Sequence, residues 1–121
     1  MRHLNELQNK KEFLVRRSME VLCEQLREKM GPAGDYDSVT VNFRFPGTDN
    51  KAQFYVEWHS KSEKILKLST RVLPEGSDKC VSNYMEQGTL EELLAYLGNK
   101  KNLPILLQSF QHLSDSVDNW D

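Results

Sequence analysis

Few residues of this chain have the thiol or imidazole side chains that most often bind transition metals or act as nucleophiles, and they are widely separated in sequence. They are Cys23, Cys80, His3, His59 and His112. A protein-bound metal needs three or four converging ligands, and no two of these residues share a recognised ligand spacing. The chain also lacks the glycine-rich phosphate-binding, zinc-protease, dithiol and nucleophile-elbow motifs. We therefore expect no metal ion and no cofactor.

Neither cysteine has the surroundings that activate a thiol. A reactive cysteine must be accessible and must be ionised by a base or a helix N-terminus. Cys23 follows Leu22 in an apolar-periodic segment, where a thiol packs as a small hydrophobe. Cys80 lies near a turn, and the sequence identifies no base beside it. A catalytic role for either thiol is therefore not favoured.

The carboxylates gather in two places near the C-terminus. Glu91 and Glu92 follow Thr89, an arrangement typical of a helix N-terminus, where negative charge stabilises the helix dipole. The second group, Asp115, Asp118 and Asp121, is interpreted as a solvated helix face, with an acidic contact patch as the alternative. From residue 76 onward three lysines stand against seven carboxylates, so this third of the chain is acidic.

Length and composition indicate one domain over residues 1–121. The chain has 38% hydrophobic and 28% charged residues, which is ordinary for a globular protein. Its net charge of −2 creates no long-range attraction for phosphate backbones or anionic lipid. Two cysteines, no apolar leader and no run of roughly 20 apolar residues predict a cytoplasmic protein without a membrane partner.

Hydrophobic periodicity predicts the elements that position these residues. Apolar residues at helical spacing indicate a long helix from about residue 4 to residue 30, ending at Gly31 and Pro32. Strict alternation over 39–45, 54–59 and 65–72 predicts three strands. A fourth strand over 80–86 is a weaker inference, because that run has one β-branched residue.

Two helices are predicted after the strands. Thr89 is the expected N-cap of the first, which ends at Gly98. Asn102 is the candidate cap of the second, with Pro104 in its first turn. The second helix has one apolar stripe, formed by Leu106, Phe110, Leu113, Val117 and Trp120. The predicted fold is α+β, a two-layer sandwich in which helices cover one face of an antiparallel meander of three or four strands.

One candidate surface is the polar face of the sheet, where the alternation places aromatic residues among basic ones. It is predicted to carry Asn42, Arg44, Tyr55, Glu57, His59, Lys67, Ser69, Arg71 and, if the fourth strand forms, Tyr84. The candidate binding residues are Arg44, Tyr55, His59, Lys67 and Arg71. Open sheets of this kind stack bases in several single-stranded RNA binders. Basic residues also occur on exposed strands simply because their stems cover apolar surface.

A second candidate surface lies on the first helix. Phe13, Val15 and Met19 lie off the line of Leu7, Leu14 and Val21, so the helix has more apolar width than one seam requires. The excess either widens the core contact or contacts a partner or a second subunit.

The sequence is compatible with three functions. The leading hypothesis is a non-catalytic module that binds another protein, in a chaperone-like or neutralising role, or that forms a homodimer through Phe13, Val15 and Met19. The first alternative is single-stranded nucleic-acid binding through the polar sheet face. The second is a small enzyme with a site assembled from Tyr55, His59, Cys80 or Tyr84.

Overall fold

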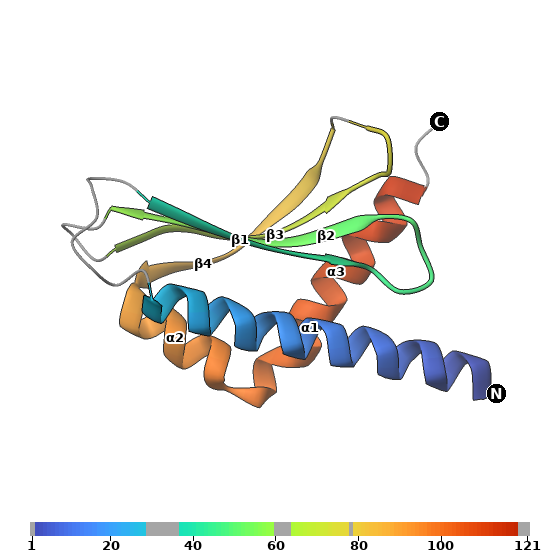
Figure 1. Cartoon of the computed structure of the whole chain (residues 1–121), viewed down its shortest axis with the longest axis horizontal. Coiled ribbons are helices and arrows are strands. Elements are labelled where there is room, and N and C mark those ends of the chain that lie inside the picture. The colour runs from blue at the N-terminus through green and yellow to red at the C-terminus, as the bar shows by residue number, and fades with distance from the viewer. Residues whose placement is uncertain (1, 29–36, 60–63, 78, 119–121) are drawn as a thin grey trace.

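The protein is built from two layers, a four-stranded sheet and a layer of helices (Figure 1). The computed structural model describes residues 2–28, 37–59, 64–77 and 79–118. The elements follow the order α1 (Arg2–Glu28), β1 (Asp37–Arg44), β2 (Lys51–His59), β3 (Lys64–Leu73), β4 (Val81–Thr89), α2 (Leu90–Gly98), the 3-10 helix η1 (Lys100–Asn102) and α3 (Leu103–Asp118). The α+β fold predicted from the sequence is therefore confirmed, with four strands.

The sheet is an antiparallel meander in which each strand pairs with the next along the chain. A tight turn joins β1 to β2, and Gly47 occupies it at a φ of 82°, a conformation that residues with a side chain rarely adopt. The backbone N–H of Phe45 donates to the carbonyl of Asn50 at 3.0 Å and closes this turn. The register that follows fixes which side chains share a face.

The apolar face of the sheet packs against the helices. Alternate residues of β1 and β2 are buried there, including Val39, Val41, Phe54 and Val56. Phe110 of α3 reaches the centre of this layer, with ring centroids 5.0 Å from Phe54 and 5.1 Å from Phe43. The buried apolar residues form one contiguous cluster.

Polar pairs lie between α3 and the sheet. Thr70 Oγ1 and Ser109 Oγ share a hydrogen bond of 2.7 Å, and the side-chain amide of Asn83 also donates to Ser109 Oγ at 3.2 Å. Near the β1–β2 turn, Asn50 Nδ2 donates to Ser114 Oγ at 3.0 Å. These bonds satisfy hydroxyls that the docking of α3 removes from water.

The junction between β4 and α2 matches the predicted helix start. Thr89 Oγ1 accepts a hydrogen bond from the backbone N–H of Glu92 at 3.1 Å, as an N-cap does. The fourth strand is confirmed and extends to Thr89, beyond the predicted end at residue 86. Asn102, predicted to cap the last helix, instead donates its side-chain N–H to the carbonyl of Tyr96 in α2.

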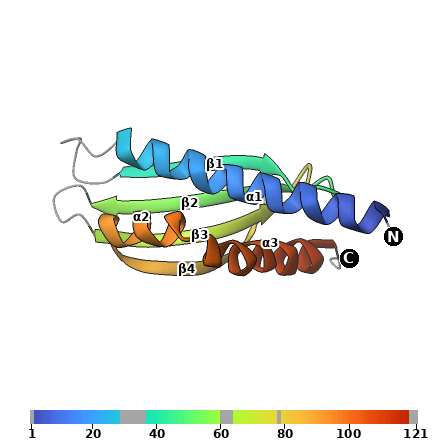
Figure 2. The same cartoon turned by 90° about the horizontal axis from the view of Figure 1, so that it is seen from below.

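Helix α1 lies along the β1 edge of the sheet, and its N-terminal end extends past the sheet and past α3 (Figure 2). Its buried line consists of Val15, Met19, Leu22, Cys23 and Leu26. The predicted helix end at Gly31 and Pro32, and Trp120 of the predicted α3 stripe, lie outside the described residues.

Candidate functional site

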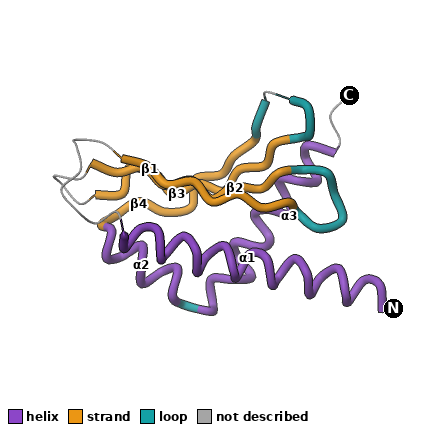
Figure 3. The backbone as a smooth tube through the Cα atoms, in the orientation of Figure 1, coloured by secondary structure: helices purple, strands orange, loops and turns teal. Residues whose placement is uncertain are grey.

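The two faces of the sheet differ in what covers them. All three α-helices lie on one face, and no described helix or loop crosses the other (Figures 1 and 3). On this open face the register aligns side chains in rows across the strands. The middle row runs from Thr40 through Tyr55 and Ser69 to Tyr84. The predicted polar face is therefore present and open in the chain described.

Each tyrosine of the middle row lies beside a cation of β3. The Arg71 guanidinium carbon is 3.7 Å from the centroid of the Tyr55 ring, and Lys67 Nζ is 4.6 Å from that of Tyr84. Both are cation–π contacts, in which the ring quadrupole attracts the cation. Tyr84 remains 67% exposed. Three of the predicted binding residues, Tyr55, Lys67 and Arg71, are thus brought together.

Ser69 lies at the centre of this group and is fully buried, although it is on the open face. Its relative exposure is 0%, against an intermediate exposure for Lys67 and Arg71 on the same strand. Among the side chains that the structure describes, Ser69 Oγ is the buried polar atom without a hydrogen-bond partner. Such atoms are rare in native proteins because each costs desolvation free energy.

The open face is positive in an otherwise acidic protein. The side chains described on it include four cations and one carboxylate: Arg44, Lys51, Lys67 and Arg71 against Glu57. The whole chain has a net charge of −2. Arg44 also lies 3.6 Å from the carboxylate of Asp49 in the turn, and both side chains are mostly exposed. The face therefore favours anionic groups over cationic ones.

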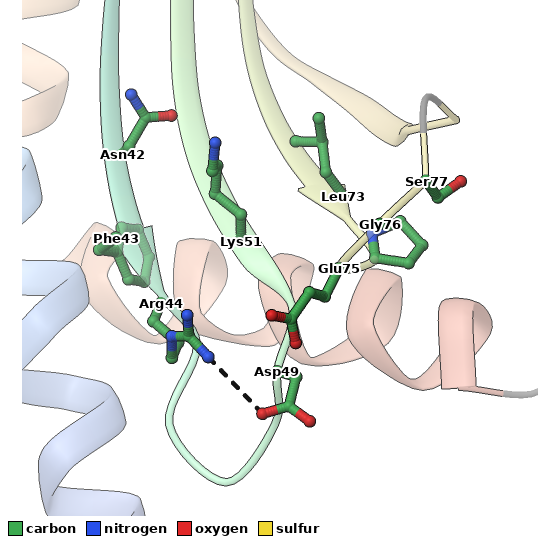
Figure 4. A pocket seen from close by; sticks show the side chains of 10 residues that line it. Asn42, Phe43, Arg44, Asp49, Lys51, Leu73, Glu75, Gly76 and Ser77 are labelled. Carbon is green, nitrogen blue, oxygen red and sulfur yellow. Dashed lines mark ion pairs between the residues drawn. The ribbon is translucent and has the colours of Figure 1, made fainter.

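A shallow hollow of about 520 Å³ lies where β1, β2 and β3 meet their turns. Figure 4 shows Asn42, Arg44 and Lys51 on one side of it and Asp49 and Glu75 at its rim. Its two cations and two carboxylates balance, so the hollow has no net charge to select a ligand. The cations that can select an anionic ligand, Lys67 and Arg71, lie farther along β3.

The remaining predicted face residue, His59, is not part of the group around Ser69. It ends β2 four residues beyond Tyr55, roughly 13 Å along the strand. Cys80 precedes β4, four residues before Tyr84, and β2 and β4 run in the same direction. His59 and Cys80 therefore lie toward opposite ends of the sheet, and the structure does not assemble the enzyme site considered from the sequence. The side chain of His59 is outside the described part.

The predicted helix surface requires a correction. Val15 and Met19 are 0% and 4% exposed and belong to the core, so they are not available to a partner. Phe13 is 55% exposed. At 3.6 residues per turn Phe13 points about 160° away from Val15 and about 120° away from Met19. The three residues do not form one surface, because Val15 and Met19 widen the core contact while Phe13 points to solvent.

Phe13 has a small apolar hollow beside it, bordered by Leu14 and Pro46 with Asn9 and Lys10. Arg16 lies 5.9 Å above its ring centroid. Phe13 alone offers a partner much less apolar surface than the predicted surface of Phe13, Val15 and Met19 would have offered.

The thiols and carboxylates have structural surroundings. Burial raises the pKa of the Cys23 thiol above its ordinary value of 9.0, although the nearby Arg27 opposes this, so the thiol stays protonated at neutral pH. Glu92 takes part in the cap at Thr89, and Asp118 accepts a hydrogen bond from Asn50. Within the described ranges no three His, Cys, Asp or Glu side chains lie close enough together to hold a metal ion.

Two residues of the open face were missed as binding candidates in the sequence. Lys51 begins β2, three residues before the predicted strand start, and extending the alternation back through Gln53 would have included it. Ser69 was assigned to the face but not to the site. A short hydroxyl side chain between Lys67 and Arg71 on one strand was the available signal.

Comparison of the chain with protein-family profiles, with curated protein sequences and with solved structures found no match. Over the described residues, no helix has the length and apolar character needed to cross a membrane.

Proposed function

We propose that this protein is a non-catalytic binding module that recognises an acidic segment of another protein through the open face of its sheet. The observation that carries the proposal is the charge of that face. Arg44 and Lys51 are balanced by Asp49 and Glu75 around the hollow, but Lys67 and Arg71 outnumber Glu57 beside Ser69, in a chain of net charge −2. Complementary potentials steer partners together and fix their orientation.

The residue types on the face also support a protein partner. Tyrosine and arginine are enriched at interface positions that contribute most to binding, because they offer large contact area at low conformational cost. The Arg71 guanidinium carbon lies 3.7 Å from the centroid of the Tyr55 ring and Tyr84 is well exposed, so this face presents both residue types to a partner.

The test is capture of partners from a lysate of the native source by three tagged proteins. The first is the wild type, and the second carries Lys67→Glu with Arg71→Glu on the open face. The third carries Lys100→Glu with Lys101→Glu, two exposed residues of η1 on the helical side. The two variants change the net charge equally, so they differ only in where the charge is reversed.

The proposal predicts that the wild type and the η1 variant capture the same protein and that the sheet-face variant loses it. Affinity of the purified pair should also fall as salt rises, because exposed charges are screened. Equal capture of that protein by all three would contradict a sheet-face interface. Light scattering of the purified chain tests self-association in the same way, since a concentration-dependent mass above 14.1 kDa would identify a second copy as the partner.

A second candidate is single-stranded nucleic-acid binding, which the two tyrosine–cation pairs favour. Bases stack on aromatic rings while arginine and lysine neutralise phosphates. It ranks second because the chain as a whole has a net charge of −2, which gives no long-range attraction for a phosphate backbone. Titration with labelled oligo-dT and oligo-U distinguishes the two. Tight binding that falls steeply with log salt supports the nucleic-acid function.

A further inference from the structure

We infer that Ser69, Lys67 and Arg71 form a subsite for one carboxylate, an aspartate or glutamate side chain of the acidic segment. This inference rests on the proposed function and names the group that the open face recognises. In the bound state the Ser69 hydroxyl donates to the carboxylate, and the two cations turn toward it from the tyrosine rings.

The first support is the unpaired hydroxyl. Ser69 Oγ is buried and has no hydrogen-bond partner, although it lies on the face that no helix covers. A hydroxyl is one donor and two acceptors, so it can complete the coordination of an anion that already has cations beside it. No described helix or loop covers it on this face.

The second support is the placement of the cations. Lys67 and Arg71 are two residues before and two residues after Ser69 on β3, so their Cα atoms lie roughly 6.6 Å on either side of it. Both are held over tyrosine rings of the neighbouring strands. Cation–π contacts are weak beside a charge-assisted hydrogen bond, so an arriving carboxylate can draw the cations from the rings.

The third support concerns the type of anion. Glu57 lies directly opposite Lys67 in the β2–β3 register. Lys67 and Arg71 against Glu57 leave one net positive charge, which a carboxylate neutralises, whereas a phosphate dianion would leave a negative charge uncompensated. The subsite therefore suits an acidic peptide better than a phosphopeptide or a nucleic-acid backbone.

The probe for this inference is a fluorescent nine-residue peptide of alternating Glu and Thr, which presents its carboxylates on one side when extended. Its controls are the same peptide with Gln for Glu, and a third with phosphoserine for Glu. The protein variants are Ser69→Ala and Ser82→Ala. Ser82 is an exposed serine on the same face, opposite Arg71, and serves as the matched control.

Ser69→Ala should weaken binding of the Glu peptide about tenfold or more, the usual effect of losing a hydrogen bond to a charged group. Ser82→Ala should leave the affinity unchanged, and the Gln peptide should not bind measurably. Chemical shifts of the Ser69 amide in the wild type should move in a saturable manner with the Glu peptide.

Three results would overturn the inference: equal affinity of the wild type and Ser69→Ala, tighter binding of the phosphoserine peptide, or no saturable shift at Ser69. The peptide titration needs no natural partner, so its result is independent of the lysate test of the proposed function. Binding of the Glu peptide without a protein captured from lysate would refute the function and retain the subsite. If capture of a protein from lysate depends on Lys67 and Arg71 but Ser69→Ala has no effect on peptide binding, the proposed function is retained and the subsite is refuted.

Discussion

Replacement of Ser69 by alanine should stabilise the protein, which is an unusual expectation for a fully buried position. A buried donor without a partner costs about 1–3 kcal/mol of desolvation free energy, and Ser69 Oγ has no partner. Alanine retains the Cβ and leaves a void of one oxygen atom, whose lost contacts are worth about 0.1–0.2 kcal/mol each. The net change should be a gain of about 1 kcal/mol in the free energy of unfolding.

The adjacent residue, Thr70, provides a control for which the expected change in the free energy of unfolding has the opposite sign. Thr70 is equally buried but points to the helical side, where its hydroxyl shares a 2.7 Å hydrogen bond with Ser109. Thr70→Val keeps the shape and removes the hydroxyl, so Ser109 loses this hydrogen bond and keeps the one from Asn83. The free energy of unfolding should fall by about 1–2 kcal/mol.

Urea denaturation of both variants, followed by circular dichroism, measures these differences, provided that the slope with urea is unchanged. A loss of 1 kcal/mol or more in Ser69→Ala would contradict this expectation, because it would mean that the hydroxyl is bonded in the folded protein. The proposed carboxylate subsite would then lose its first support. A gain would mark Ser69 as a position where stability is sacrificed, as is common at binding sites.

Three further predictions concern the core, the first turn and the buried thiol. Phe110→Ala should cost about 3–5 kcal/mol of unfolding free energy, whereas Phe13→Ala should change it by less than about 0.5, both measured by urea denaturation. Gly47→Ala, at a φ of 82°, should cost about 1–2 kcal/mol, whereas Gly98→Ala, with open space around it, should cost nothing; thermal melts distinguish them. The folded pKa of Cys23 is raised, so the folded state holds its proton longer than the unfolded state and the thiol's contribution to stability is lost as pH rises above about 9. Denaturation of Cys23→Ala should therefore show a smaller loss of stability above that pH than the wild type.

The sequence predicted the elements well where one local pattern determined them. Alternation over 39–45 identified β1 because one face of the sheet is buried and the other is not. The spacing of Leu106, Phe110, Leu113 and Val117 identified the buried stripe of α3. Thr89 was recognisable as a cap because the hydroxyl acts on an amide three residues away.

Features that depend on contacts between strands were less accessible. Apolar residues occur on both sides of the true core line of α1, so the pattern did not reveal that Val15 and Met19 face the sheet while Phe13 faces solvent. The end of β4 was placed too early because the pairing of Gly88 with Ile65, and not residue type, extends the strand. The charged face was predictable from alternation.

The centre of the candidate site was not predictable. The stacking of Arg71 on Tyr55 is a diagonal contact, since Arg71 is paired with Gln53, and it depends on the register between β2 and β3. The unpaired state of Ser69 Oγ depends on every side chain around it. The order of residue types along the chain reveals neither the Arg71–Tyr55 contact nor the unpaired Ser69 hydroxyl.

The most direct test of the central claim is to map the partner's footprint on the isotope-labelled protein by NMR. The perturbed amides should cluster in β2, β3 and β4 around Tyr55, Ser69 and Tyr84, while those of α1 and α3 stay unchanged. Perturbations that cluster instead on α1 around Phe13, with the strands unaffected, would contradict it and return the interface to the helical side.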